Sequence, residues 1–326
     1  MDAFVLAGDR GRSRAVLGNN KAFLALAGRP LFLHVLAALD GVRQVDRVFI
    51  VGPKAEIEQT LATSPARSLT KPCIVLEQKR TLLENALSAY DEALRSHPTP
   101  DSDPPALFLS ADIPLVTSEE IEVFIARADL RHADYCIGVV RSERLAPFYP
   151  TADQPGIRMA YLHLKEAAYR INNLHCVRPR RVRVTGYIQA AYDLRHQKEF
   201  GNVLKTLWMI LHAPPLFQAL GLYLLARCAS GFEKMRLTLL THACRRFLST
   251  AAVERRLSHF LGAAVAFVET PAAGGALDVD DAATWATLSS RYPEWRQGVK
   301  QTESSPSSVA PAIAPSPLPL GDPSFR

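Results

Sequence analysis

The stretch "FVLAGDRGRSRAVLGNNKAF" at residues 4–23 combines glycines, arginines and a lysine directly after a short apolar run. Gly8, Gly11 and Gly18 free the backbone to turn several N–H groups toward one anion. The positive charges in the same stretch are Arg10, Arg12, Arg14 and Lys21. The pattern is neither G-x-x-x-x-G-K-[ST] nor G-x-G-x-x-G. It predicts a loop that binds phosphate groups, with a plain solvated loop as the alternative.

Two later stretches carry carboxylates. "LFLSADIPLVT" places Asp112 directly after an apolar run, and "GALDVDDAATW" places Asp278, Asp280 and Asp281 before the last helical segment. Carboxylate oxygens are the ligands that Mg²⁺ prefers. In an extended segment Asp278 and Asp280 would share a side, whereas we expect Asp281 to cap the helix. The alternative role for Asp112 and Asp280 is a turn or a cap.

Three other stretches give weaker signals. "RINNLHCVRP" offers Asn172 and Asn173 as hydrogen-bonding groups for a polyol or a phosphate, although a simple turn explains them equally well. "LLENALSAY" presents Asn85 near the start of a predicted helix. "RPRRVRV", at 178–184, would contact an anionic substrate or lipid surface, or else form a solvated strand edge.

Apolar runs and helical periodicity supply the elements that must position these residues. Strands are predicted at 3–7, 46–52, 71–78 and 106–115, each followed by a helical segment. Such alternation, with strands apolar on both faces, is typical of an α/β domain with a mainly parallel sheet. Ligands bind at the carboxyl ends of such strands, so Gly8–Lys21 and Asp112 should lie along one edge.

The pattern changes beyond residue 134. Further strands are predicted at 134–140, 171–179, 180–186 and 263–270, and a final helix at 280–295. The apolar segment 197–261 has helical character, and charged residues and prolines interrupt it too often for a membrane span. We therefore expect one domain over 1–298 with a helical insertion at about 190–262. A disordered Ser-, Pro- and Ala-rich tail should cover 299–326.

The overall composition limits the classes of ligand and partner that the sequence predicts. The net charge of +6 suits an anionic small substrate or a membrane surface, but the dense basic block of a nucleic-acid binder is absent from the sequence. The five cysteines are scattered without a C-x-x-C pair, which predicts neither a disulfide framework nor a zinc site. With no leader-like segment at the start, a cytoplasmic location is expected.

The opening stretch resembles the signature L-A-G-G-x-G-x-R…K-x-L-x-x-x-G-x-P-L of the MobA-like (molybdenum-cofactor guanylyltransferase-like) nucleotidyltransferases, relatives of nucleotide-diphospho-sugar transferases. The matching residues are Leu6, Ala7, Gly8, Gly11, Lys21, Gly28, Pro30 and Leu31. Asp9 replaces the second glycine and Ser13 the arginine, so Arg10, Arg12 or Arg14 would have to compensate. The "ADIP" and "LDVDD" segments also resemble this family, and the resemblance covers roughly 3–140 and 262–292.

The resemblance implies a three-layer sandwich with a mostly parallel, mixed sheet and a helical insertion. It also implies transfer of a nucleoside monophosphate from a triphosphate to a phosphorylated small-molecule acceptor, with Mg²⁺ and release of pyrophosphate. The implied residues are Lys21, Arg12 and Arg14 for catalysis; Leu6, Ala7, Gly8, Asp9, Arg10, Gly11, Asn85 and Asp112 for the nucleotide; Asn172 and Asn173 for the acceptor; and Asp112 and Asp280 for the metal.

Other functions stay open on the sequence. "DVD" at 278–280 is the D-x-D of a metal-dependent glycosyltransferase, although it lies later in the chain than usual. Asp9 and Ser13 would also suit a nucleotide-binding relative that has lost catalysis. The apolar stretch 203–225 has three explanations: peripheral membrane contact, a homo-oligomer interface or an ordinary core.

Overall fold

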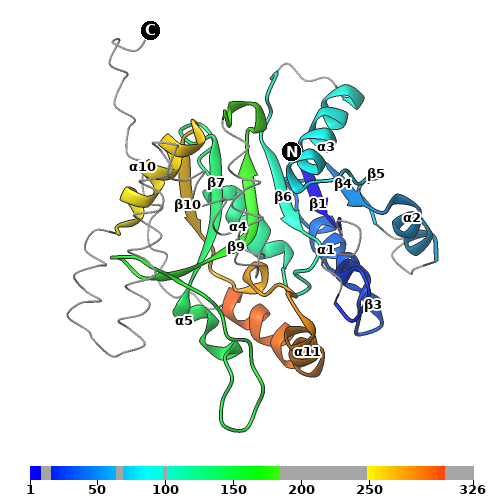
Figure 1. Cartoon of the computed structure of the whole chain (residues 1–326), viewed down its shortest axis with the longest axis vertical. Helices are drawn as coiled ribbons and strands as arrows, with labels where there is room; N and C mark the ends of the chain where they lie inside the picture. Colours follow the sequence, from blue (N-terminus) through cyan, green and yellow to red (C-terminus); the bar gives the residue numbers. More distant parts are fainter. Residues whose placement is uncertain (9–15, 64–68, 98–100, 184–247, 305–326) are drawn as a thin grey trace, which may run out of the picture.

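A computed structural model describes residues 1–8, 16–63, 69–97, 101–183 and 248–304. Within these residues a central sheet has the strand order β10-β7-β9-β6-β1-β4-β5, with the short β8 beside β9 (Figure 1). The strands are β1 (Asp2–Leu6), β4 (Arg47–Gly52), β5 (Cys73–Glu77), β6 (Ala106–Ser110), β7 (Tyr135–Arg141), β8 (Leu162–His163), β9 (Ala168–Val177) and β10 (Val265–Glu269). A separate two-stranded hairpin joins β2 (Ala25–Leu26) to β3 (Arg29–Pro30).

The sheet is mixed, as predicted. β1 pairs in parallel with β4 and β6, and β10 pairs in parallel with β7. β9 is antiparallel to both β6 and β7, between which it lies. The carboxyl ends of β1, β6 and β7 therefore point to the same edge, because two antiparallel pairings in succession restore the original direction.

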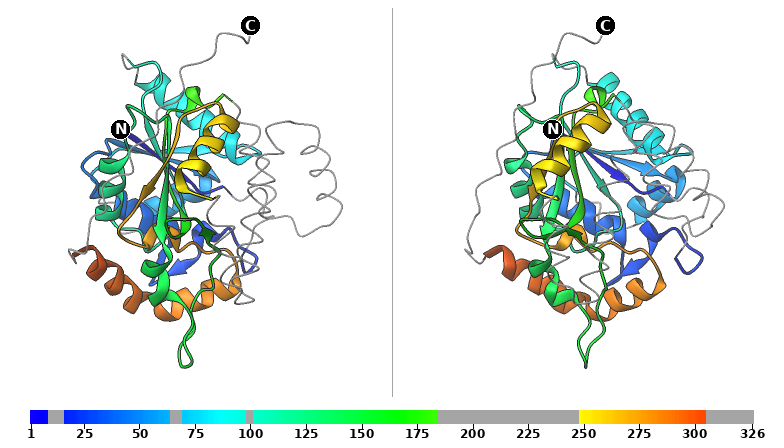
Figure 2. Two further views of the ribbon diagram at one scale, coloured as in Figure 1. Left: turned by 90° about the vertical axis from the view of Figure 1, so that its left-hand side faces the viewer. Right: turned by 60° about the vertical axis from the view of Figure 1, so that its left-hand side comes forward.

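Helices cover both faces of the sheet (Figures 1 and 2). They are α1 (Leu31–Asp40), α2 (Lys54–Thr63), α3 (Leu82–Ser96), α4 (Ser118–Arg127), α5 (Ser142–Leu145), α10 (Thr250–Leu261) and α11 (Ala282–Ser304), with short 3₁₀ turns η1 (Lys21–Phe23), η3 (Ala146–Phe148), η4 (Pro179–Arg181) and η5 (Gly274–Ala276). Phe32 of α1 and Phe124 of α4 share one core with Val5 of β1. On the opposite face, Tyr90 of α3 packs with Phe4 of β1.

Caps explain where several helices begin. Thr81 and Glu84 form a reciprocal capping box at the start of α3, and Thr117 accepts from the N–H of Glu120 at the start of α4. As expected, Asp281 accepts from the N–H of Thr284, at 2.8 Å, in the first turn of α11. These local signals lie at the carboxyl edge of the sheet, where the loops turn into helices.

Several predicted boundaries need correction, and the strand expected at 106–115 ends at Ser110. The strand expected at 180–186 is absent from its described part, residues 180–183, because the chain makes the 3₁₀ turn Pro179–Arg181 there. The last helix ends at Ser304 rather than at residue 295, so it runs into the first residues of the predicted disordered tail. Most of the predicted insertion and the end of the predicted tail lie outside the described residues, although α10 falls within the insertion's range. Among the helices of the described ranges, none is long and apolar enough to cross a membrane.

Candidate active site

Asn20 fixes the end of the opening loop, the predicted phosphate-binding stretch at residues 8–21, against the end of β1. Its side-chain amide donates to the carbonyl of Ala7 at 3.0 Å, and its side-chain oxygen accepts from the N–H of Ala22, also at 3.0 Å. These bonds hold the turn η1, and with it Lys21, beside the carboxyl end of β1. The predicted residues Asp9, Arg10, Gly11, Arg12 and Arg14 lie outside the described residues.

Lys21 points from this turn to the carboxyl end of β6. Its ammonium forms an ion pair with the Asp112 carboxylate and donates to the carbonyl oxygen of Val279 at 2.9 Å. Burial alone would lower the pKa of Lys21, but attraction to Asp112, and more weakly to Asp280 and Asp278, outweighs it and raises the pKa above its ordinary value. Lys21 is therefore a fixed positive charge at neutral pH.

Asp112 is the buried carboxylate of the site. Asp112 is only 2% exposed, so its ion pair with Lys21 is largely shielded from water. The Ser110 hydroxyl donates to the other carboxylate oxygen of Asp112, and the Asp112 carbonyl accepts from the N–H of Val279 at 3.1 Å. Both side-chain oxygens are thus engaged, and the main chain of Asp112 is joined to the segment that precedes α11.

That segment, residues 274–280, is called here the closing segment. Asp278 is buried within it and forms an ion pair with Arg170 of β9 at 2.7 Å, whereas Asp280 is exposed. The sequence singled out the two aspartates but not Arg170. Arg170 is a single arginine in a strand, and no short stretch of sequence connects it with Asp278, which lies 108 positions later.

Gly8 and Asn85 meet at the carboxyl end of β1. A Cβ atom at Gly8 would lie 3.1 Å from both the Asn85 amide nitrogen and the Gln78 side-chain oxygen, so a larger residue here would have to displace these side chains slightly. Asn85 is buried and its side-chain oxygen accepts from the N–H of Lys79. The structure thus places Asn85 next to Gly8, and nucleotide binding by Asn85 stays a prediction.

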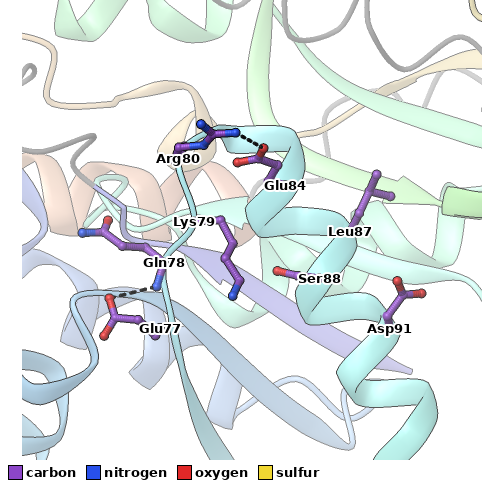
Figure 3. Close-up of a pocket in the computed structure, with 8 residues that line it drawn as sticks. All are labelled: Glu77, Gln78, Lys79, Arg80, Glu84, Leu87, Ser88 and Asp91. Carbon is purple, nitrogen blue, oxygen red and sulfur yellow. Dashed lines mark hydrogen bonds and ion pairs between the residues drawn. The ribbon is translucent and has the colours of Figure 1, made fainter.

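A wide pocket of about 990 Å³ lies beside this contact, between the loop after β5 and helix α3 (Figure 3). In Figure 3 the amine of Lys79 points into the space between that loop and the helix. The lining residues are Glu77, Gln78, Lys79, Arg80, Glu84, Leu87, Ser88 and Asp91. Its mixture of acidic and basic groups is suited to a polar ligand.

The two asparagines of β9 have different surroundings. Asn172 is 1% exposed, donates to the Thr270 hydroxyl at 3.1 Å and accepts from the N–H of Leu174. A Cβ atom at Gly138 would overlap its side chain, so Asn172 fills the space that this glycine leaves. Asn173 is partly exposed and donates to the Gly275 carbonyl at 3.1 Å. Both residues lie within strand β9, and acceptor binding by this pair stays a prediction.

The donor chemistry of the site suits a hard cation. Asp112 and Asp280 supply carboxylates, and Mg²⁺ is commonly held by one or two carboxylates together with waters and substrate phosphates. Among the described residues there is no group of three or more His, Cys, Asp or Glu side chains that could hold a metal by themselves. Two carboxylates alone would leave the other positions around such an ion to water and to the phosphates of a substrate.

The arginines of "RPRRVRV" lie at the other edge of the sheet. Arg178 pairs with Asp101 at 2.6 Å, Arg180 with Asp91 at 3.3 Å and Arg181 with Asp134 at 3.1 Å. These ion pairs connect the end of β9 to neighbouring loops. They favour a structural role over the anion-binding hypothesis.

Comparisons with known proteins give three similarities. The family model of the MobA-like NTP transferase domain matches residues 3–266. A phosphoenolpyruvate guanylyltransferase from Sphaerobacter thermophilus is 34% identical over 93 residues, which make up 28% of this chain and only 40% of that relative. A solved hypothetical transferase from Thermus thermophilus is 22% identical with a TM-score of 0.50, covering 86% of this chain and 96% of its own, a likeness in fold.

Proposed function

The chain belongs to the MobA-like NTP transferase family, and from that premise we propose that it transfers a nucleoside monophosphate from a nucleoside triphosphate to a phosphorylated small-molecule acceptor, using Mg²⁺. The observation that carries this proposal is the meeting of Lys21, Asp112 and Val279 at the carboxyl edge of the sheet. A fixed ammonium next to a buried carboxylate provides charges of both signs for a metal-bound triphosphate.

The proposed reaction is an in-line displacement at the α-phosphorus. An oxygen of the acceptor's phosphate forms the new bond to this phosphorus, and the bond from the phosphorus to the oxygen bridging the α and β positions breaks. The electron pair of that bond leaves with pyrophosphate. The second pKa of a phosphate monoester is about 6, so the acceptor's phosphate is largely ionised at neutral pH. Its attack therefore requires no general base.

The residues then act by position and charge. The opening loop, at 8–21, holds the triphosphate, and Lys21 stabilises the negative charge that grows on the departing phosphates. Asp112 and Asp280 would hold the metal ion, which when bound neutralises phosphate charge as a Lewis acid. Arg12 and Arg14 are proposed to assist Lys21, and Leu6, Ala7, Asp9, Arg10 and Gly11 to line the nucleotide through the loop.

The nucleoside end is proposed to lie near Gly8 and Asn85, next to the pocket beside α3. We propose GTP as the first nucleotide to test, since the curated relative is a guanylyltransferase. Asn173, which is partly exposed on β9, stays our candidate for acceptor contact, with Asn172 supporting it from the buried side.

The decisive experiment measures pyrophosphate release with each of the four ribonucleoside triphosphates, Mg²⁺ and a panel of phosphorylated sugars, polyols and three-carbon acids. We expect turnover with one nucleotide and one acceptor. Transfer from a nucleotide sugar with release of a nucleoside diphosphate would instead favour the glycosyltransferase alternative. Triphosphate binding without turnover in any pair would favour the non-catalytic alternative, and absence of triphosphate binding would overturn the proposal.

A further inference from the structure

Side chains of helix α4, strand β9 and turn η1 hold the closing segment in place. Both carboxylate oxygens of Glu120, in α4, accept from the N–H of Gly275, at 3.0 and 3.2 Å. Asn173 of β9 donates to the carbonyl of the same glycine at 3.1 Å. These contacts secure the beginning of the segment, four residues before the atom that Lys21 binds.

Arg170 secures the middle of the closing segment. Its Nε donates to the Ala276 carbonyl at 2.9 Å, while one terminal nitrogen donates to the Asp278 carboxylate at 2.7 Å. The planar guanidinium keeps its donors at fixed relative positions. One side chain therefore fixes a main-chain atom and a side-chain atom two residues apart, which restrains the backbone between them.

The residue that follows this restrained stretch is part of the site. Val279 donates its N–H to Asp112 and accepts from Lys21 through its carbonyl, and Asp280 comes next. A shift of the backbone at 276–278 would move both of these contacts. Within the described part of the chain, no hydrogen bond or ion pair joins Arg170 to Lys21 or Asp112, so any influence on them passes through the closing segment.

We infer that Arg170 is a positioning residue, which holds the closing segment so that Val279 and Asp280 face Lys21 and Asp112. The relevance of this position to metal binding rests on the function proposed above. The positioning itself does not, because it concerns contacts between residues of this chain.

The chain offers a closely matched control in Arg178. Its guanidinium also joins a carboxylate and a main-chain carbonyl two residues apart, Asp101 at 2.6 Å and Asp103 at 2.6 Å. The side chains of Arg170 and Arg178 are 13% and 16% exposed. Arg178 follows the carboxyl end of β9 and thus lies across the sheet from the closing segment, so Arg178→Met removes a similar interaction elsewhere.

The test compares hydrogen exchange of the amides in 274–281 in the full wild-type chain and in Arg170→Met, Arg170→Lys and Arg178→Met. We expect exchange to be at least about tenfold faster in Arg170→Met, since a hydrogen bond to a charged group contributes on that order. Arg170→Lys should lie between, because lysine keeps the charge but loses the guanidinium's fixed donors. Arg178→Met should match wild type.

Exchange that is unchanged in Arg170→Met overturns the inference, as does equal acceleration in Arg178→Met, which would indicate general loosening. If Arg170→Met does not fold, wild-type exchange in Arg170→Lys overturns it in the same way. These outcomes require no metal or substrate.

A second measurement connects position to chemistry. Mn²⁺ binding in the presence of GTP, followed by electron paramagnetic resonance, should weaken about 10-fold or more in Arg170→Met, the size of effect typical of losing a residue that keeps metal ligands in position. Arg178→Met should bind Mn²⁺ as wild type does. Wild-type protein that binds no Mn²⁺ would contradict the proposed function, while the exchange result would still decide the role of Arg170.

Discussion

At the scale of single residues, the site is a balance of opposite charges. Lys21 neutralises Asp112, and Ser110 engages the other oxygen of the same carboxylate. Arg170 neutralises Asp278 in the same way. A buried carboxylate is stable only with such partners, so each pairing explains why an acidic residue can lie beside the core.

Asp112→Asn tests the carboxylate. We expect pyrophosphate release to fall at least about 100-fold, because a neutral amide binds a hard cation poorly and leaves the phosphate charge uncompensated. The measurement is the rate with the active pair of substrates at saturating Mg²⁺. Asp129→Asn, which changes a partly exposed carboxylate paired with His132, serves as the control. Equal rates for wild type and Asp112→Asn would exclude Asp112 from the metal site.

Lys21→Met should change metal binding and catalysis in opposite directions. In the absence of nucleotide, Lys21 competes with any cation for Asp112, so its removal should tighten Mn²⁺ binding about threefold or more. Pyrophosphate release should fall about 100-fold, because the departing phosphates lose a positive charge. Lys54→Met, which removes an exposed lysine paired with Glu58, should alter neither quantity.

The contrary result is equally informative. Weaker Mn²⁺ binding in Lys21→Met would mean that the lysine orders Asp112 for the cation instead of competing with it. The raised pKa of Lys21 also predicts that its charge does not titrate between pH 6 and 9. A pH-dependent rate in that window must therefore come from another group, such as the acceptor phosphate.

At the scale of elements, the closing segment depends on glycine for close packing. A Cβ atom at Gly274 would lie 2.3 Å from the carbonyl oxygen of Leu115, a main-chain atom that cannot move aside easily. At Gly298 in α11, the described residues outside its own helical backbone place no atom within 4 Å of the same position. The same glycine-to-alanine substitution should therefore lower the free energy of unfolding at Gly274 and raise it at Gly298.

Gly274→Ala should lower the free energy of unfolding by about 2–3 kcal/mol, the usual cost of overpacking a fixed site. Gly298→Ala should raise it by up to about 1 kcal/mol, because alanine is the better helix former. Urea unfolding of both variants checks the difference. A Gly274→Ala protein as stable as wild type would mean that the turn before Asp278 can relax without loss.

At the scale of the whole molecule, two histidines couple stability to pH. Burial lowers the pKa of His175 in β9 to about 4, and burial likewise lowers the pKa of His34 in α1. Tyr135 lies 3.1 Å from one ring nitrogen of His175, so the neutral ring has a partner on the neighbouring strand. Protonation is therefore favoured in the unfolded chain relative to the folded one.

His175→Phe should flatten the acid limb of the stability curve. Between pH 6.5 and about 4 the unfolded chain binds a proton that folded His175 does not, so this residue makes stability fall as the pH falls, by at most about 1.4 kcal/mol per pH unit. Urea midpoints at several pH values measure the slope. His259→Asn, at an exposed position, should keep the wild-type slope, and an unchanged slope in His175→Phe would contradict the lowered pKa.

Much of the fold and part of the candidate site can be predicted from the sequence, because the patterns that indicate them lie within short stretches of the chain. Apolar runs marked β1, β4, β5 and β6, and their alternation with helices predicted a mainly parallel sheet. Since parallel strands end at one edge, the stretch ending at Lys21 and the residue Asp112 are expected on the same edge, and Lys21 forms an ion pair with Asp112. The cap at Asp281 was predicted for the same local reason.

Other features were decided only by tertiary structure. The antiparallel insertion of β9 between β6 and β7 has no signature in any short segment, yet it alone carries Arg170 to Asp278 and Asn173 to Gly275. It also buries Asn172 and ends in the arginines that pair with Asp101, Asp91 and Asp134. Residue types and spacing thus determined which charges this protein brings to the edge of its sheet. Strand order determined which partners hold them, because contacts between residues more than a hundred positions apart depend on the whole chain's packing.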